Sequence, residues 1–485
     1  MKSKWVYGFG TILVCGLIFW GVNSKKIHRN ISSNEPSKKV DVLTTSMEEL
    51  DEVKRINSLI VAITSKDEIN AKIDEVQAIS AKHPDWNIIK LYSLILNPIK
   101  KLEGFIWRLR PVVEDCGVCH IYALSFIKDL YYSDYLGGPH TKAVLNYFVE
   151  PTNNQEQFEK ISTFQDFMLN QLSPDLMASL ESLKSVIENT KPGYFFDLDG
   201  HLISGYSNEK GKEFRFISEK NRSKKIVRGN LHYLSAGFNQ ALGTIYLSVN
   251  YNVDSITKFA NSMIRGTALN NFRRTLPRHV TPKELLKTVN KAKFRSLGTA
   301  RLDKYSKEQI QENLDSSFNY FKQSLSSRIL AFQQSRDEAD MQMSSDYLIS
   351  PKLLDLNYDD AMAKLKEKIR IYKNASKNES SVITSQATGH MFKVNPRAIF
   401  LYREDLKKFL PEKMYKETKR KSKIKLANGE KTVFWNYKYG MPIKWQDPTF
   451  GGLLPDASNS NLFEILRSMR LTPATRTFAS FLPIP

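Results

Sequence analysis

The sequence predicts a mainly α-helical protein, in which an N-terminal single transmembrane helix is followed by a multi-helix body with one or two small β-hairpins. Three observations predict this class. An uncharged apolar run lies near the start of the chain, apolar residues then recur at intervals of three and four residues over most of its length, and Asp-Gly and Asn-Gly dipeptides interrupt that period. Hydrophobic and charged residues make up 41% and 25% of the chain, so a sizeable core can form.

The chain after the apolar run is long enough for two or three packed units of about 100–200 residues each. Changes in composition predict five segments: 1–24 as a transmembrane signal-anchor, 25–46 as a polar linker, 47–190 as a helical domain, 191–395 as a hairpin plus helical domain, and 396–485 as a basic helix, a hairpin and an extended tail rich in Gly and Pro. The linker has few large apolar residues, as expected of a tether between a membrane and a globule.

The apolar run extends from Trp5 to Val22 and is flanked by lysine and arginine on both sides. Its length is about the ~20 residues that cross a hydrocarbon core, and Trp5 and Trp20 lie near its ends, where aromatic rings favour the headgroup layer. Residues 22–24 form a passable cleavage site, but two lysines follow, so we expect an uncleaved anchor with cleavage as the alternative. The very short basic N-tail favours a body outside the cytoplasm, although both flanks are basic.

The expected location is a bacterial inner membrane, with a single span and the body facing the periplasm. Two stretches, Arg228–Ala236 and Asp447–Pro455, look similar to stretches of uncharacterised bacterial envelope proteins, and this resemblance implies a cell-envelope location. The expected partners are membrane lipid, through the N-terminal helix, and an anionic surface or protein, because the net charge is +20.

Helices are predicted through the first half of the body. Apolar spacing from Met47 to Ile79 predicts a helix pair, and a helix start is predicted at Ser173-Pro174-Asp175, where an N-cap residue precedes a first-turn Pro and an acid. Helix breaks are predicted at His83-Pro84, Pro111, Gly137-Gly138-Pro139 and Lys191-Pro192-Gly193.

Two hairpins interrupt the helices of the second half. Asp199-Gly200 predicts a turn between strands at 194–196 and 202–204, with 214–217 as a third strand, and Asn428-Gly429 predicts a turn between strands at 421–426 and 431–437. Helices are predicted at 231–264 and at 307–332, and another is predicted to start at the capping box Thr281-Pro282-Lys283-Glu284.

The sharpest motif is Cys116-Gly117-Val118-Cys119-His120, which matches the spacing of c-type haem attachment. Two thioethers from Cys116 and Cys119 would hold one haem, and His120 would be its iron ligand. An ordinary core helix is predicted directly after the motif, which favours a Cys116–Cys119 disulfide in an oxidising compartment, with free thiols or a redox pair as a third reading. Only Cys15 remains, so four zinc ligands are lacking. We therefore predict no cofactor, with haem c as the alternative.

A second motif, Tyr194-Phe195-Phe196-Asp197-Leu198-Asp199-Gly200, resembles the first motif of haloacid-dehalogenase-type phosphatases. The resemblance implies that Asp197 attacks phosphorus and that Asp199 serves as acid and base. It covers about ten residues, His201 stands where that family usually has Thr, and the alternating α/β elements of the family do not follow. A hairpin with an Asp-Gly turn is the competing explanation, and no catalytic residue is predicted.

The segment from Arg403 to Lys425 holds ten basic and four acidic residues, an excess of six positive charges. The predicted contacts to an anionic surface are Lys416, Lys419, Arg420, Lys421, Lys423 and Lys425. Outside the cytoplasm their targets would be lipid headgroups or cell-wall polymers, at about 1 kcal/mol per basic residue. Nucleic acid is not expected, because aromatic residues do not interleave with the lysines, and a solvated face with no partner is the other reading. The eight histidines show no metal-binding spacing. A membrane-anchored protein with a binding or scaffolding role is predicted, without catalysis.

Overall fold

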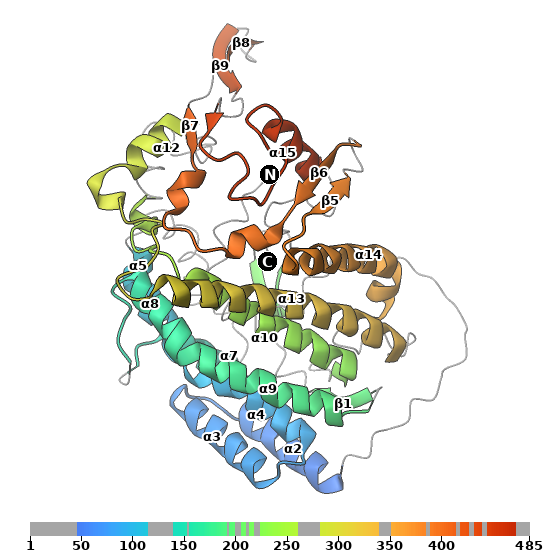
Figure 1. The fold of residues 1–485 in the computed structure, drawn as a ribbon. Coiled ribbons are helices and arrows are strands. Elements are labelled where there is room, and N and C mark those ends of the chain that lie inside the picture. Colours follow the sequence, from blue (N-terminus) through green and yellow to red (C-terminus); the bar gives the residue numbers. More distant parts are fainter. Residues whose placement is uncertain are drawn as a thin grey trace.

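The computed structural model describes residues 46–114, 139–152, 155–191, 194–198, 205–209, 213–217, 224–259, 282–338, 351–384, 389–413, 418–425, 431–438 and 444–471. Helices make up most of this part of the chain, which confirms the mainly helical class (Figure 1). The predicted transmembrane helix, and the predicted linker up to residue 45, lie outside it.

Five helices are described before residue 150, and the first three of them lie together at one end of the molecule (Figure 1). They are α2 (Met47–Val61), α3 (Asp67–Lys82), α4 (Asn87–Lys100), α5 (Phe105–Glu114) and α7 (Pro139–Val149). The predicted break at His83-Pro84 is confirmed between α3 and α4. Ser46 caps α2 by accepting a hydrogen bond from the Glu49 amide, and the buried Glu49 carboxylate accepts one from the Ile88 amide at 2.7 Å. Glu49 thus joins the start of α2 to the start of α4.

One proline signal is wrong, because Pro111 lies inside α5 and does not end it. The second is confirmed in part. α9 (Ser173–Asn189) starts at the predicted place, with Pro174 and Asp175 in its first turn, but it continues directly from α8 (Ile161–Phe167) and the π-helical turn η1 (Met168–Leu172), so Ser173 is not an N-cap. Proline lacks an N–H and its ring collides with the carbonyl four residues earlier, and the wider π turn directly before Pro174 accommodates it. In that turn the Ser173 amide donates to the Met168 carbonyl.

The strands described form five two-stranded antiparallel sheets, β1–β4, β2–β3, β5–β6, β7–β10 and β8–β9. Their bounds are β1 (Tyr194–Leu198), β2 (Gly205–Glu209), β3 (Glu213–Ile217), β4 (Lys224–Val227), β5 (Ser381–Thr384), β6 (Met391–Val394), β7 (Pro411–Lys413), β8 (Thr418–Lys425), β9 (Lys431–Lys438) and β10 (Lys444–Trp445).

The turn predicted at Asp199-Gly200 and the strand predicted at 202–204 lie outside the described residues. The predicted first strand lies within β1, which pairs with β4, with Tyr194 opposite Val227, and the β2–β3 hairpin lies between them in the sequence. The sequence did not predict the β1–β4 pairing, because the two strands lie far apart along the chain. The predicted strand at 214–217 lies within β3, and the hairpin predicted at 421–437 is confirmed as β8–β9.

The remaining helices are α10 (Arg228–Ser248), α12 (Pro282–Val289), α13 (Lys307–Glu338), α14 (Pro351–Ser376) and α15 (Leu462–Leu471), with the 3₁₀ turns η3 (Ala292–Phe294), η5 (Pro396–Phe400) and η6 (Leu406–Phe409). The helix predicted from 231 to 264 is interrupted after Ser248, where Tyr251 forms a bridge with Ala300, and residues 260–264 lie outside the described residues. The predicted basic helix is wrong, since η6, β7 and β8 occupy that segment. The predicted extended tail is also wrong at 462–471, where α15 packs through Leu462 and Ile465.

Three buried clusters hold these elements together. The largest extends from Val53 in α2 to Val249 after α10, so it includes residues from both sides of the domain boundary predicted at residue 190. A second joins α13, α14 and η5, and a third joins the β5–β6 pair, η5 and α15. Figure 1 shows α9, α10 and α13 stacked side by side in the middle of the molecule, with α14 beyond them.

Helices α10 and α13 are antiparallel and unusually close. Small residues occur every seventh position on α10, at Gly229, Ala236 and Gly243. The Ser317 hydroxyl donates to the Gly243 carbonyl at 2.6 Å, and the Ser324 hydroxyl donates to the Ala236 carbonyl at 2.8 Å. Side-chain hydroxyls of one helix therefore bond directly to the backbone of the other, which requires a short distance between their axes.

Candidate functional site

The cysteine motif lies outside the described residues. Helix α5 ends at Glu114, directly before this segment, and α7 starts at Pro139, after it. Cys116, Cys119 and His120 therefore remain a predicted disulfide, haem-attachment site or thiol pair.

Asp197 of the phosphatase-like motif lies in β1, and Asp199 lies outside the described residues. β1 pairs antiparallel with β4, with Asp197 opposite Lys225. The resemblance implies a sheet with alternating strands and helices, whereas the strands of the described part pair in antiparallel twos. The surroundings of Asp197 do not match the fold that the resemblance implies.

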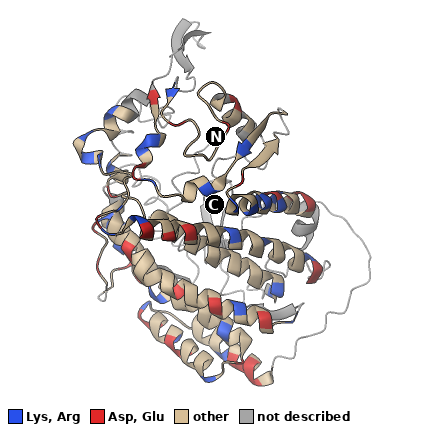
Figure 2. Ribbon diagram, viewed as in Figure 1, with Lys and Arg blue, Asp and Glu red and all other residues tan. Residues whose placement is uncertain are grey.

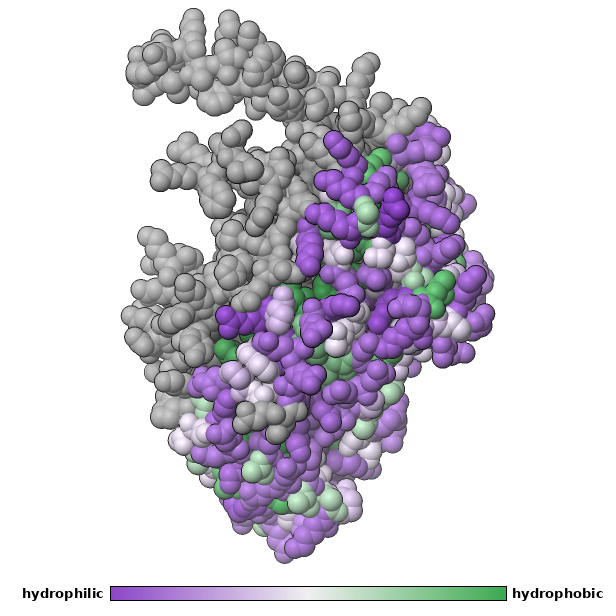
Figure 3. Space-filling model, turned by 90° about the vertical axis from the view of Figure 1, so that its left-hand side faces the viewer, coloured by the Kyte–Doolittle hydropathy of each residue, from purple (hydrophilic) through white to green (hydrophobic). Residues whose placement is uncertain are grey.

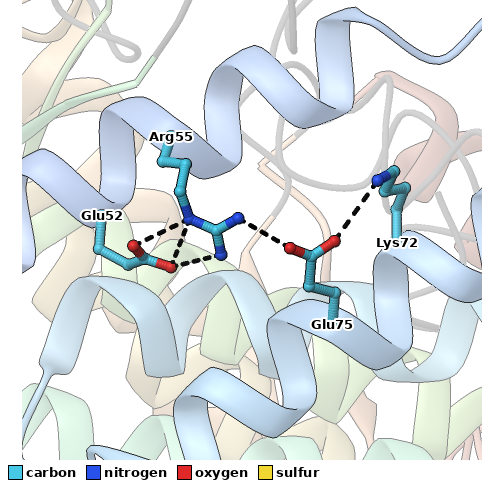
Figure 4. Close-up of polar contacts among 4 residues, drawn as sticks. All are labelled: Glu52, Arg55, Lys72 and Glu75. Carbon is cyan, nitrogen blue, oxygen red and sulfur yellow. Dashed lines mark hydrogen bonds and ion pairs between the residues drawn. The ribbon is translucent and has the colours of Figure 1, made fainter.

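Acidic side chains come together most clearly where α2 meets α3 (Figure 4). The Arg55 guanidinium binds both Glu52 oxygens and donates to Glu75 at 2.8 Å, and Lys72 also contacts Glu75. The Arg55 hydrogen bond lowers the pKa of Glu75 from its ordinary value. This network is solvent-exposed and its carboxylates are already paired, so it links two helices. In the part of the chain that the structure describes, no group of His, Cys, Asp and Glu has a metal-binding arrangement.

A buried arginine lies in the first core. The Arg108 guanidinium stacks over the rings of Phe158 and Phe167, at 4.2 and 4.4 Å from their centroids, and its Nε donates to the Glu156 carbonyl. Burial lowers the pKa of Arg108 to about 10. The two rings and the carbonyl give this cation a packing role between α5 and α8.

The predicted anionic-surface residues lie mainly on β8, and their pairing with β9 divides them between two faces. Opposite residues of an antiparallel pair share a face, and neighbours along a strand alternate between faces. Lys419 lies opposite Tyr437, Lys421 opposite Trp435, Lys423 opposite Val433, and Lys425 opposite Lys431. Arg420 lies opposite Asn436, on the other face. Lys416 lies outside the described residues.

One face of the β8–β9 hairpin therefore holds five lysine positions together with Trp435 and Tyr437; we call it the lysine face. The sequence prediction missed its aromatic members, because they come from the next strand and not from the basic segment. Alternation along 431–438 was the available signal, but only the register shows which alternate set joins the lysines. Figure 1 shows this hairpin at one end of the molecule, beyond β7.

A second basic feature was not predicted. A pocket of about 570 Å³ lies along α14 where it meets α13. Its lining residues are Lys322, Lys366, Ile369, Arg370, Lys373, Asn374, Ser376 and Lys377. Five of these are cationic, and none is a carboxylate. Figure 2 shows Lys and Arg gathered along the half of α14 that carries these residues.

Only part of this positive charge is neutralised by the chain. Arg370 forms an ion pair with Glu367 at 2.6 Å, outside the pocket lining. Lys322 donates to the Ser376 hydroxyl at 3.3 Å, a neutral partner. Lys368 also lies on α14. Its pKa is lowered mainly by burial and further by the charges of Arg328 and Lys364. This half of α14 therefore carries an excess of positive charge.

The exposed apolar residues indicate a binding surface less clearly than the basic residues do. Figure 3 shows a mostly hydrophilic face over the part that the structure describes, with hydrophobic residues scattered across it. The large exposed apolar side chains of the described residues are Met47, Ile256, Leu302, Leu330, Val382, Met391 and Leu401, which come from different elements. In the same residues, no helix is both long and apolar enough to cross a membrane.

We compared the chain with protein-family models, with curated proteins and with solved structures, and none of the three comparisons found a match.

Proposed function

We propose that this is a single-pass membrane protein of the cell envelope, with a helical scaffold whose β8–β9 hairpin binds an anionic lipid surface. The observation that carries the proposal is the β8–β9 register, which joins five lysine positions with Trp435 and Tyr437 on one face. The proposal includes the predicted N-terminal anchor, the inner membrane as its location, and a body on the periplasmic side.

The composition of the lysine face suits lipid headgroups. Each lysine near an anionic membrane contributes about 1 kcal/mol, so five contribute about 5 kcal/mol, a factor of roughly 5,000 in affinity. Trp and Tyr prefer the headgroup layer, since their rings are apolar at one end and polar at the other. The predicted anchor would hold the hairpin near a membrane, which raises its effective concentration there. These points favour lipid over a soluble polyanion.

The test uses full-length protein held in nanodiscs of neutral lipid and measures its co-sedimentation with vesicles of phosphatidylglycerol or phosphatidylcholine. Two double variants provide a matched comparison, since each removes two charges from the hairpin. K421Q/K423Q changes the lysine face, and R420Q/K438Q changes the opposite face. We expect K421Q/K423Q to weaken binding to anionic vesicles about 30-fold. The loss in R420Q/K438Q should be several-fold smaller than that.

Equal losses in the two variants would contradict the role of the lysine face. Binding to phosphatidylcholine as tight as to phosphatidylglycerol would contradict the electrostatic basis. A single-stranded oligonucleotide that binds more tightly than the vesicles, with the same dependence on Lys421 and Lys423, would replace lipid by nucleic acid.

A further inference from the structure

The pocket along α14 has a regular arrangement of charge. Lys366, Arg370, Lys373 and Lys377 follow one another at intervals of four, three and four residues, which places them in one stripe along the helix and its last turn. From Lys366 to Lys377 the stripe is about 16 Å long, at about 1.5 Å per residue. Lys322 of α13 adds a fifth cation beside it.

Repulsion between the cations of this stripe destabilises α14 when no ligand is bound. Like charges four residues apart destabilise a helix by about 0.2–0.5 kcal/mol per pair, and Lys366–Arg370 and Lys373–Lys377 are two such pairs. Glu367 pairs with Arg370. Among the described residues, no ion pair is formed by Lys366, Lys373 or Lys377. An anion from outside the chain would relieve this repulsion.

The other residues of the pocket fix its shape. The Ser376 hydroxyl donates to the Tyr372 carbonyl and accepts from Lys322, which holds the Lys322 ammonium at the pocket. The Asn374 amide donates to the Ser381 hydroxyl at 3.0 Å, which ties this turn of α14 to β5. Lysine ammonium groups bind phosphate as point charges, and their flexible stems adapt to its position.

We infer that this pocket binds a small ligand that carries two or more phosphate groups. A volume of about 570 Å³ lies within the range of small-molecule sites. One phosphate would reach only part of a stripe of this length, whereas linked phosphates would contact lysines at both ends. The inference does not depend on the proposed lipid binding, since the pocket and the lysine face share no residue.

The experiment measures binding of tripolyphosphate and of inorganic phosphate to full-length protein in neutral nanodiscs by calorimetry. We expect tripolyphosphate to bind at least about tenfold more tightly than phosphate. K373Q/K377Q should weaken tripolyphosphate binding at least about tenfold, because two charge-assisted contacts are lost. The control K82Q/K160Q removes two exposed lysines elsewhere and should change it less than about twofold. K421Q/K423Q should keep the affinity, which separates this site from the lysine face.

Three results would overturn the inference: no tripolyphosphate binding by the wild type, unchanged binding by K373Q/K377Q, or an equal loss in K82Q/K160Q. Thermal unfolding of K373Q/K377Q should occur at or above the wild-type temperature, since a repulsive pair is removed. Should it unfold earlier, K322Q/K366Q tests the same pocket from both helices, and unchanged binding by that variant would also overturn the inference.

Discussion

At the scale of single residues, the two glycines at the α10–α13 contact have a steric role. A Cβ added to Gly229 would lie 2.4 Å from the Ser335 backbone nitrogen, and one added to Gly243 would lie 2.9 Å from the Phe321 ring. A backbone atom cannot move aside without shifting its helix. The absence of a side chain at Gly229 therefore permits the close approach of α10 and α13, whereas Gly237 on the same helix has open space around it.

We predict that Gly229→Ala lowers the free energy of unfolding by about 1–3 kcal/mol, because the new methyl group overpacks the contact with α13. Gly237→Ala is the matched control, and it should raise the free energy of unfolding by up to about 1 kcal/mol through helix propensity alone. Denaturant unfolding measures both. A neutral Gly229→Ala would show that the helices lie further apart than the structure has them.

His232 of α10 gives a prediction about pH. Burial, followed by the charge of Arg228, lowers the pKa of His232 below its ordinary value of 6.5. The unfolded chain therefore takes up the proton at a higher pH than the folded protein does. Stability should be fully present above pH 6.5 and should fall as the pH drops through the folded pKa. His232→Gln should flatten this acid slope in unfolding measured at pH 7.5 and below, and an unchanged slope would contradict the assignment.

At the scale of elements, hydroxyl groups add to the close packing of α10 and α13. Ser317 and Ser324 are buried and donate to carbonyls of the facing helix, whereas Ser326 donates to the Lys322 carbonyl of its own helix. Ser317 and Ser324 therefore make contacts between the two helices, whereas Ser326 makes one within α13.

Ser317→Ala and Ser324→Ala should each lower the free energy of unfolding by about 0.5–1.5 kcal/mol. The double variant should show nearly the sum, since the two sites are seven residues apart, about 10 Å along the helix. Ser326→Ala should stay within about 0.5 kcal/mol of the wild type. The measurement is denaturant unfolding, and an equal effect of all three substitutions would contradict the interhelical role.

The β8–β9 hairpin shows how much of an element is visible in sequence. Its two strands and its Asn-Gly turn are local signals, and they predicted the pairing. These local signals do not fix the register. A shift by one residue would put Phe434 and Asn436 beside the lysines in place of Trp435 and Tyr437. The candidate lipid-binding surface depends on that register.

At the scale of the whole molecule, the proposal joins two attachments of different strength: a predicted helix across the membrane and a hairpin on an anionic surface. The helix would be retained by hydrophobic burial, which salt does not weaken, whereas the lysine face acts through charges that salt screens. The two contributions can be separated by washing conditions.

Full-length protein should stay in the membrane fraction after washing with about 1 M salt, at which the screening length is about 3 Å. A variant without residues 1–24 should bind anionic membranes at low salt and leave them at high salt. The variant with both that deletion and K421Q/K423Q should bind anionic membranes about 30-fold more weakly at low salt. Retention of the deletion variant at high salt would contradict the predicted anchor.

The sequence by itself determined the helical class, the break at His83-Pro84, the β8–β9 hairpin and the excess of positive charge, because periodicity, turn residues and charge act over a few neighbouring positions. Only the tertiary structure decided that β1 pairs with β4, that a π turn carries the helix through Pro174, and that Lys322 joins the stripe of α14. The physical reason is that these features depend on contacts between segments distant in the chain, or on packing strong enough to override a local signal such as proline.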